Sequence, residues 1–165
     1  MKTQTIKKIN FTNAEQWKYT NPKKFTSCTF DFIPNNKTLN IKCNDNEIII
    51  HNGTIYLKGN IFKQNNILLN NLHKDSFQIQ RGVSLKIPRN TIIEKPIKIK
   101  HIIDNGDKNS FFNYKNYIEV GKNSSVTLIN EELFPITHCI NITFEVSIYN
   151  DANLNIINHS EKPNT

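Results

Sequence analysis

Hydrophobic and polar residues alternate along much of this chain, and the clearest case is Ile97-Lys98-Ile99-Lys100. Because neighbouring side chains on a strand point to opposite faces, this alternation predicts strands with one buried and one solvated face. Cys28–Phe32 shows the same alternation. His51-Asn52-Gly53 separates two further apolar runs, Glu47–Ile50 and Thr54–Leu57, and predicts a tight hairpin turn.

Helical signals are confined to short segments. Thr12 and Glu15 have the spacing of a capping box, and Asn21-Pro22 is typical of the start of a second short helix that reaches Phe25. Ile61–Leu72 is the only later stretch that could be helical, although its Asn residues and its missing caps argue against a helix. We therefore predict a short-helix segment over 1–27, an irregular β region over 28–74 and a β core over 75–165.

An internal repeat is the most informative pattern. Ile118–Asn130 and Val146–Asn158 carry their apolar residues at the same positions, with an offset of 28, and Leu85–Ile93 matches the first of them at an offset of 33. Each copy reads as a strand, a short polar turn and a second strand. Repeats of this length with short strands are typical of solenoids, in which each unit packs only on its neighbours.

The repeat favours an all-β fold of the parallel β-helix type, because rungs of a β-helix can differ in loop length while their strands stay stacked. Stacking predicts one interior column formed by Ile87, Val120 and Ile148. It also predicts that three turn residues align at a corner, where Asn and Asp tolerate turn geometry: Asn90, Asn123 and Asp151. An antiparallel sandwich built from similar hairpins is the alternative.

Composition adds little about function. Asn, Ile and Lys account for 72 of the 165 residues (27, 26 and 19), which indicates an AT-rich genome. The net charge of +7 invites a nucleic-acid hypothesis. The lysines are spread along the chain and alternate with Ile, however, so we interpret them as a solvated sheet face and expect no nucleic-acid partner. Neither a membrane span nor a secretory signal is visible, and we expect a cytoplasmic or organelle-stroma protein.

Few residues carry recognisable chemistry. Cys28, Cys43 and Cys139 fit neither a disulfide framework nor a C-x-x-C site, and His138 beside Cys139 would point to the opposite strand face. Glu131-Glu132 reads as a solvated loop end, and His101 as a hydrogen-bonded structural histidine that faces inward. Glycine-rich phosphate loops and hydrolase motifs are missing from the sequence. We predict no enzyme activity, no bound cofactor or metal, and no catalytic, cofactor-binding or metal site residues.

A series of short segments follows one another along the chain: Glu15–Thr20 (E-x-W-K-Y-T), Asn52-Gly53, Asp75-Ser76-Phe77, Gly82–Pro88, Glu94–Ile97 and the two later copies, Tyr117–Glu131 and Phe144–Asn158. In their order and spacing these segments resemble the SufB/SufD family of iron–sulfur cluster assembly proteins. The resemblance extends from Phe11 to about His159. The E-x-W-K-Y-T segment favours the SufD branch of the family. The resemblance implies a right-handed parallel β-helix and a non-catalytic scaffold of the SUF system that acts with SufB-like and SufC-like subunits.

Family members are much longer than this chain. The strands that face SufB, the Cys and His residues of that region and the helices that dock SufC have no counterpart here, so the resemblance assigns no site residue. We expect a truncated or split SufD whose β-helix is completed by a second polypeptide. The alternatives are a β-solenoid module that binds protein or carbohydrate, and a degraded, non-functional SufD remnant.

Overall fold

A computed structural model describes residues 42–52, 54–72, 82–103, 111–133 and 139–161 of the chain. Several predictions concern residues outside these ranges. They are the helices within residues 1–27, the Cys28–Phe32 strand, and the E-x-W-K-Y-T and Asp75-Ser76-Phe77 segments.

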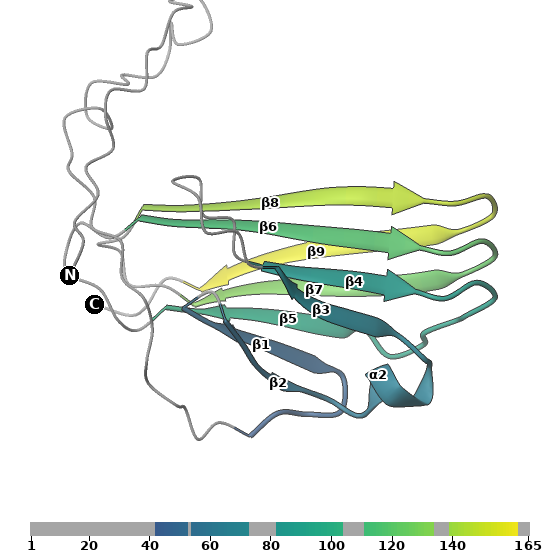
Figure 1. Cartoon of the computed structure of the whole chain (residues 1–165), viewed down its shortest axis with the longest axis horizontal. Coiled ribbons are helices and arrows are strands. Elements are labelled where there is room, and N and C mark those ends of the chain that lie inside the picture. Colours follow the sequence, from purple (N-terminus) through teal and green to yellow (C-terminus); the bar gives the residue numbers. More distant parts are fainter. Residues whose placement is uncertain (1–41, 53, 73–81, 104–110, 134–138, 162–165) are drawn as a thin grey trace, which may run out of the picture.

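The described residues form two sheets and one short helix (Figure 1). The five-stranded sheet has the order β2-β1-β5-β7-β9, with strands Thr54–Lys58, Glu47–His51, Ile97–Ile102, Ser125–Leu133 and Asn153–Glu161. The four-stranded sheet has the order β3-β4-β6-β8, with strands Leu68–Leu72, Gly82–Ile87, Phe111–Val120 and Cys139–Ile148. The helix, α2, spans Ile61–Gln64.

From β4 onward the chain alternates between the two sheets, so that each strand pairs with the strand two places later. The pairs β4–β6 and β6–β8 are parallel, and so are β5–β7 and β7–β9. Only β2 and β3, which begin the two sheets, pair antiparallel with their neighbours. The predicted all-β class is confirmed, and the two sheets remain open at their edges rather than closing on one another.

The register confirms the repeat offsets and adds one correction. Ile118 pairs with Val146, at an offset of 28, and Leu85 pairs with Ile118, at an offset of 33. Ile92 still bridges to Ser125 at 33, but Ile97 pairs with Leu128, at an offset of 31. The segment from Ile92 to Ile97, which contains Pro96, is therefore two residues longer than the equivalent segment from Ser125 to Leu128.

The predicted column of Ile87, Val120 and Ile148 is in register. Ile87 and Val120 are completely buried, whereas Ile148 is 52% exposed. The prediction that all three are interior is therefore wrong for Ile148, because β8 is the edge strand of its sheet and no further strand covers it.

The corner prediction is confirmed. Asn90, Asn123 and Asp151 all adopt left-handed backbone conformations, with φ values of 57°, 59° and 57°. Asn and Asp accept this conformation more readily than other non-glycine residues. The Asn123 side-chain amide also donates a hydrogen bond to the Asn90 side-chain oxygen, at 3.0 Å, so the corner residues form a ladder between stacked turns.

The core lies between the sheets and consists mainly of Ile, Val and Leu side chains. Ile61 and Phe62 of α2 join it. The possible helix over Ile61–Leu72 is only four residues long, because Asn66 turns the backbone to a φ of 52° and β3 follows. The predicted hairpin over β1 and β2 is confirmed.

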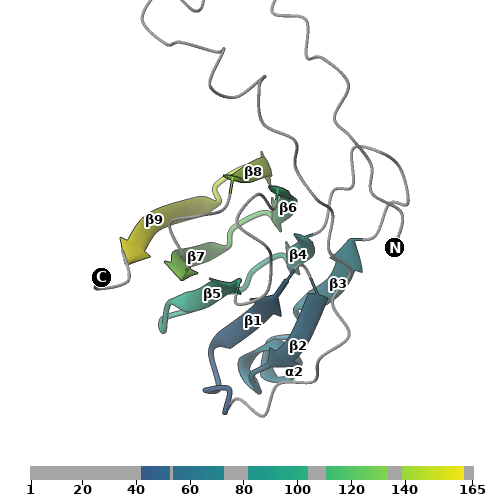
Figure 2. The same ribbon diagram turned by 90° about the vertical axis from the view of Figure 1, so that its left-hand side faces the viewer.

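The two ends of the stack differ. At one end lie the antiparallel edge strands β2 and β3 together with α2, and we call this the capped end (Figures 1 and 2). At the other end β8 and β9 are edge strands with one unpaired side each. We call the edge formed by Cys139–Ile148 and Asn153–Glu161 the open end.

Candidate functional site

The open end exposes side chains that are buried one strand earlier. Val146 is 38% exposed although its stacked equivalents, Leu85 and Ile118, are 0% and 1% exposed. Tyr149 in the turn and Ile157 on the outward face of β9 add further exposed apolar surface. Exposed apolar side chains at the edge of a stack make that edge a candidate interaction site.

The strands of the open end lack the residues that usually protect a sheet edge. Natural edges carry lysine, proline or bulges that discourage pairing with another strand. β8 and β9 contain neither Lys nor Pro, and each has a single Glu. Both are long and pair on their inner side without a register shift. The open end is therefore suited to pairing with a further strand.

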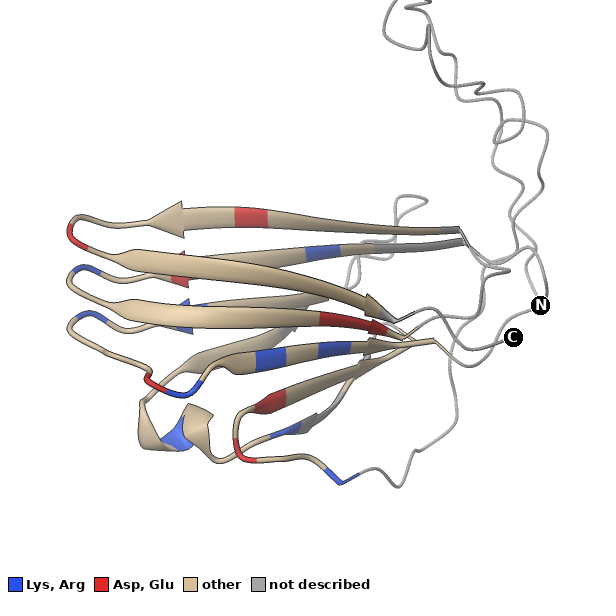
Figure 3. Cartoon of the chain, turned by 180° about the vertical axis from the view of Figure 1, so that it is seen from behind, with Lys and Arg blue, Asp and Glu red and all other residues tan. Residues whose placement is uncertain are grey.

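Outward-facing charges are arranged as pairs between neighbouring strands. The Lys ammonium and Glu carboxylate groups lie 2.6 to 2.8 Å apart in four pairs: Lys86–Glu119, Lys98–Glu131, Lys100–Glu47 and Lys115–Glu145. Figure 3 shows basic and acidic positions on neighbouring strands rather than one basic face. The predicted alternation is confirmed, with Ile97 and Ile99 inward and Lys98 and Lys100 outward.

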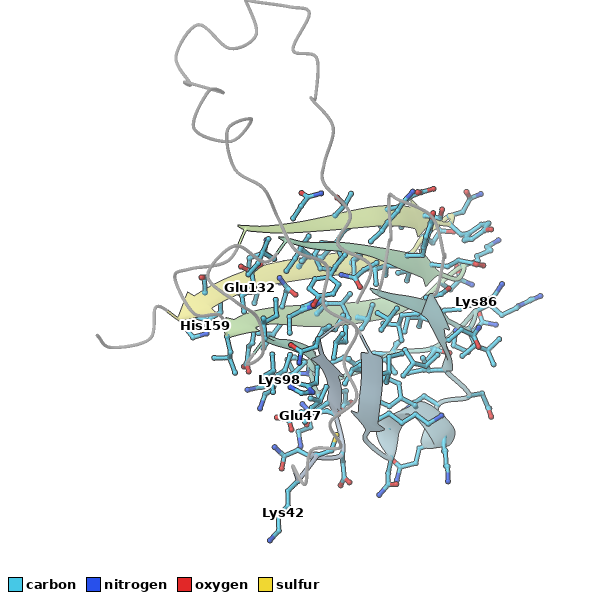
Figure 4. The ribbon with its side chains drawn as sticks, turned by 60° about the vertical axis from the view of Figure 1, so that its left-hand side comes forward. Lys42, Glu47, Lys86, Lys98, Glu132 and His159 are labelled. Carbon is cyan, nitrogen blue, oxygen red and sulfur yellow. The ribbon has the colours of Figure 1, made fainter. Side chains whose placement is uncertain are left out.

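Glu47 is the most buried member of these pairs. Burial opposes its ionisation, but hydrogen bonds from Lys100 and from the Asn44 backbone lower its pKa to about 2. Lys98, on the neighbouring strand, lies near Glu47 (Figure 4). The charged network ties β1, β5 and β7 together on their outward face.

A second feature is a group of polar residues buried between the sheets: His101, Tyr114, Asn116 and Asn130. The His101 and Tyr114 rings lie 5.3 Å apart between centroids. The Asn116 side-chain oxygen accepts a hydrogen bond from the Val83 amide at 3.1 Å, where β4 begins. The Asn130 side-chain amide donates to Asn158 at 3.2 Å and thus links β7 to β9.

His101 faces inward as predicted, but the predicted hydrogen bond is wrong. Among the described residues neither ring nitrogen has a hydrogen-bond partner. Burial alone lowers its pKa to about 3, so the ring is neutral at physiological pH. A neutral imidazole without an acidic or nucleophilic partner has no group with which to exchange a proton.

Glu131 and Glu132 are strand residues, which corrects the predicted loop end. Both lie in β7, where their side chains point to opposite faces because they are neighbours on a strand. Glu131 pairs with Lys98 outside, and Glu132 accepts a hydrogen bond from the Asn130 amide at 3.0 Å. The two carboxylates therefore diverge rather than form an acid pair.

Among the described residues, the remaining cysteine and histidine side chains form no metal-binding group. Cys43 donates a hydrogen bond to the Glu47 carbonyl, and burial raises the pKa of its thiol. Cys28, His73, His138 and the Cys139 side chain lie outside the described residues. Within the described part of the chain, no three His, Cys, Asp or Glu side chains are grouped so as to hold a metal ion.

In the part of the chain that the structure describes, outward-facing aromatic side chains do not form a column. Tyr117 stacks between Ser84 and Glu145, and the Lys115 ammonium lies 4.7 Å from its ring centre.

Within the described residues, no helix is long and apolar enough to cross a bilayer, and α2 has only four residues.

No family model, curated protein or solved structure matches this chain. The resemblance to the SufB/SufD family therefore stays a prediction from the quoted segments.

Proposed function

We propose that this protein is a non-catalytic scaffold subunit of iron–sulfur cluster assembly, similar to SufD, that works with SufB-like and SufC-like subunits in the cytoplasm or an organelle stroma. We further propose that its two sheets are walls of a right-handed parallel β-helix. The observation that supports both proposals is the pair of parallel ladders, in which the chain alternates between sheets at offsets close to 30 residues.

The residues that carry the family resemblance have demanding structural positions. A side chain at Gly82 would bring its Cβ atom within 2.2 Å of the Lys115 carbonyl oxygen, so only glycine fits where β4 begins. The Pro88 carbonyl accepts a hydrogen bond from the Ser124 hydroxyl at 2.6 Å. The Pro96 carbonyl accepts one from the Asn46 amide, also at 2.6 Å. The close approach accounts for glycine at position 82, whereas the Pro88 and Pro96 contacts use backbone carbonyls that any residue would supply.

In this proposal the chain contributes shape rather than chemistry. Iron and sulfur are the cargo of the complex, and the protein's part is to present its apolar open end to another subunit. His101 and the buried asparagines serve as interior residues, and the outward ion pairs fix the register of the strands.

Co-expression tests the proposal. The tagged full chain is produced together with SufB and SufC from the same genome, and co-purification is measured by mass spectrometry. Because the open end offers two strand edges to a second subunit, we expect SufB to co-purify with the tagged chain. We expect SufC to co-purify only when SufB is present.

The matched control is the same purification with SufC alone, in which no SufC is expected to bind. Failure of SufB to co-purify at any salt concentration that preserves the folded chain would sink the scaffold proposal. The second candidate function is a protein-binding module unrelated to cluster assembly, and the apolar open end favours it over a carbohydrate-binding module.

A further inference from the structure

The open end carries a specific pattern and not merely an apolar surface. We define a rung as one strand of the four-stranded sheet, the corner turn and the next strand of the five-stranded sheet; β6–β7 and β8–β9 are rungs. We propose that the open end binds one further rung, contributed by a partner polypeptide and paired parallel and in register with β8–β9. This inference rests on the proposed scaffold function and specifies the part of the partner that makes contact.

The apolar columns define the first requirement. β8 covers Ile118 and Val120 with Val146 and Ile148, and both covered residues are buried. Val146 and Ile148 have no such cover and are 38% and 52% exposed. A partner strand would bury them in the same way if it placed aliphatic residues at the two equivalent alternate positions.

The corner defines the second requirement. Asn123 donates its side-chain amide to Asn90 in the turn below. Asp151 has the same left-handed backbone, but its carboxylate can only accept hydrogen bonds. A partner residue above Asp151 must therefore adopt the left-handed conformation and donate a hydrogen bond, and asparagine does both.

Two side chains on the strands define the third requirement. Asn158 accepts a hydrogen bond from Asn130 through its oxygen, and within the described residues its amide group has no acceptor. Glu145 is paired with Lys115 on one side only, and its side chain is largely exposed. The partner rung should thus offer an acceptor such as asparagine above Asn158 and a cation near Glu145.

A second copy of this chain fits these requirements poorly. Two open ends related by a two-fold axis would pair their strands antiparallel, so at most one position in each strand could meet its own equivalent. The side-chain contacts between stacked corner residues, which would be extended at Asp151, and those between stacked asparagines, which would be extended at Asn158, could not both continue. Head-to-tail stacking of copies would place β8 and β9 against β2, β3 and α2, which lack the strand–corner–strand pattern of a rung.

An added rung tests the inference without any SUF protein. A copy of residues 134–161 is inserted into the full chain directly after Glu161 and before residues 162–165. Because the copy has 28 residues, the insertion preserves the offset of 28. The copy carries Asp151→Asn to supply the corner donor. It also carries Glu145→Lys, which places a cation above the native Glu145. Thr143→Ser and Asn155→Gln on its outward face make its peptides differ in mass from those of the native rung. The matched control adds Val146→Asp and Ile148→Asp to the copy.

Hydrogen exchange of the native β8 and β9 amides is then measured by mass spectrometry. In an edge strand every second backbone amide points away from the sheet. We expect the apolar copy to slow hydrogen exchange of these outer amides of β8 and β9 by about tenfold or more, because they become hydrogen-bonded to the added rung. We expect the Asp-containing copy to leave exchange unchanged. The apolar copy supplied as a separate peptide should give the same protection as its concentration is raised.

Three results would overturn the inference. One is unchanged exchange with the apolar copy, and another is equal protection by the Asp-containing control. The third is a native chain that is already a dimer with protected β8 amides, since a second copy would then occupy the open end. Because SufB takes no part, failure here is distinguishable from failure of the scaffold proposal, in which SufB does not co-purify.

Discussion

The exposed position of Ile148 allows a matched comparison within one column. Ile87 and Ile148 have the same side chain and stack on opposite sides of Val120, yet Ile87 is 0% exposed and Ile148 is 52% exposed. We predict that replacing each by alanine will lower the free energy of unfolding by very different amounts.

The expected magnitudes follow from burial. A buried Ile→Ala change costs about 2–5 kcal/mol, because it removes three carbon groups and leaves a cavity. For Ile148, three groups at about 0.8 kcal/mol each, scaled to the half that is buried, give about 1.2 kcal/mol, and an edge position leaves no closed cavity. Ile87→Ala should therefore cost at least about twice as much as Ile148→Ala.

Urea unfolding followed by far-UV circular dichroism measures both variants, with the slope of the transition compared to exclude a change in the unfolded state. If Ile87→Ala does not fold, Ile87→Val and Ile148→Val replace the pair, and about 0.5–1.5 kcal/mol is expected at Ile87 and about half of that at Ile148. Equal losses at the two positions would refute the reasoning, because they would mean that Ile148 is covered in solution.

Three further predictions concern single side chains. Because the folded pKa of Glu47 is depressed to about 2, its stabilising effect should be lost as pH falls from its ordinary value of 4.5 through 2. Glu47→Gln should flatten the acid limb of a stability–pH curve, whereas exposed Glu94→Gln should not. His101 binds a proton more readily when unfolded, since its folded pKa is about 3 against an ordinary 6.5, so stability should fall as pH drops below 6.5. His101→Leu should remove that dependence between pH 6.5 and 5, and an unchanged slope there would contradict the burial of the ring. Asn123→Ala should lower the melting temperature more than Asn123→Gly, because both lose the contact to Asn90 but glycine adopts the left-handed corner without strain. The reverse order would contradict a left-handed backbone at position 123.

The stacking could be predicted from the sequence because the offset between repeat copies specifies which residues lie next to one another on neighbouring strands. The period-two alternation specifies which residues face inward, and a constant offset between copies specifies which residues stack. Ile87, Val120, Asn90 and Asn123 were predicted on this basis, and the structure confirms their positions.

The same pattern could not reveal where the stack is interrupted. The two residues accommodated around Pro96 change the offset from 33 to 31, and nothing in the alternation records such an insertion. It also could not show that Ile148 is uncovered, because a side chain's exposure depends on whether a neighbour lies above it. The lack of a partner for His101 and the strand position of Glu131 likewise depend on residues far away in sequence.

The alternation of the chain between sheets has a consequence for synthesis on the ribosome. Residues 54–72, which supply the capped end, are made before every later described strand. From β6 onward, each new strand meets as its partner a strand completed about 30 residues earlier. Folding can therefore proceed in the direction of translation, one pair at a time, on a template that is already formed. β8 and β9 have no strand on their outer side, so they should be the first described strands of the parallel stack to fray and to be cut by a protease.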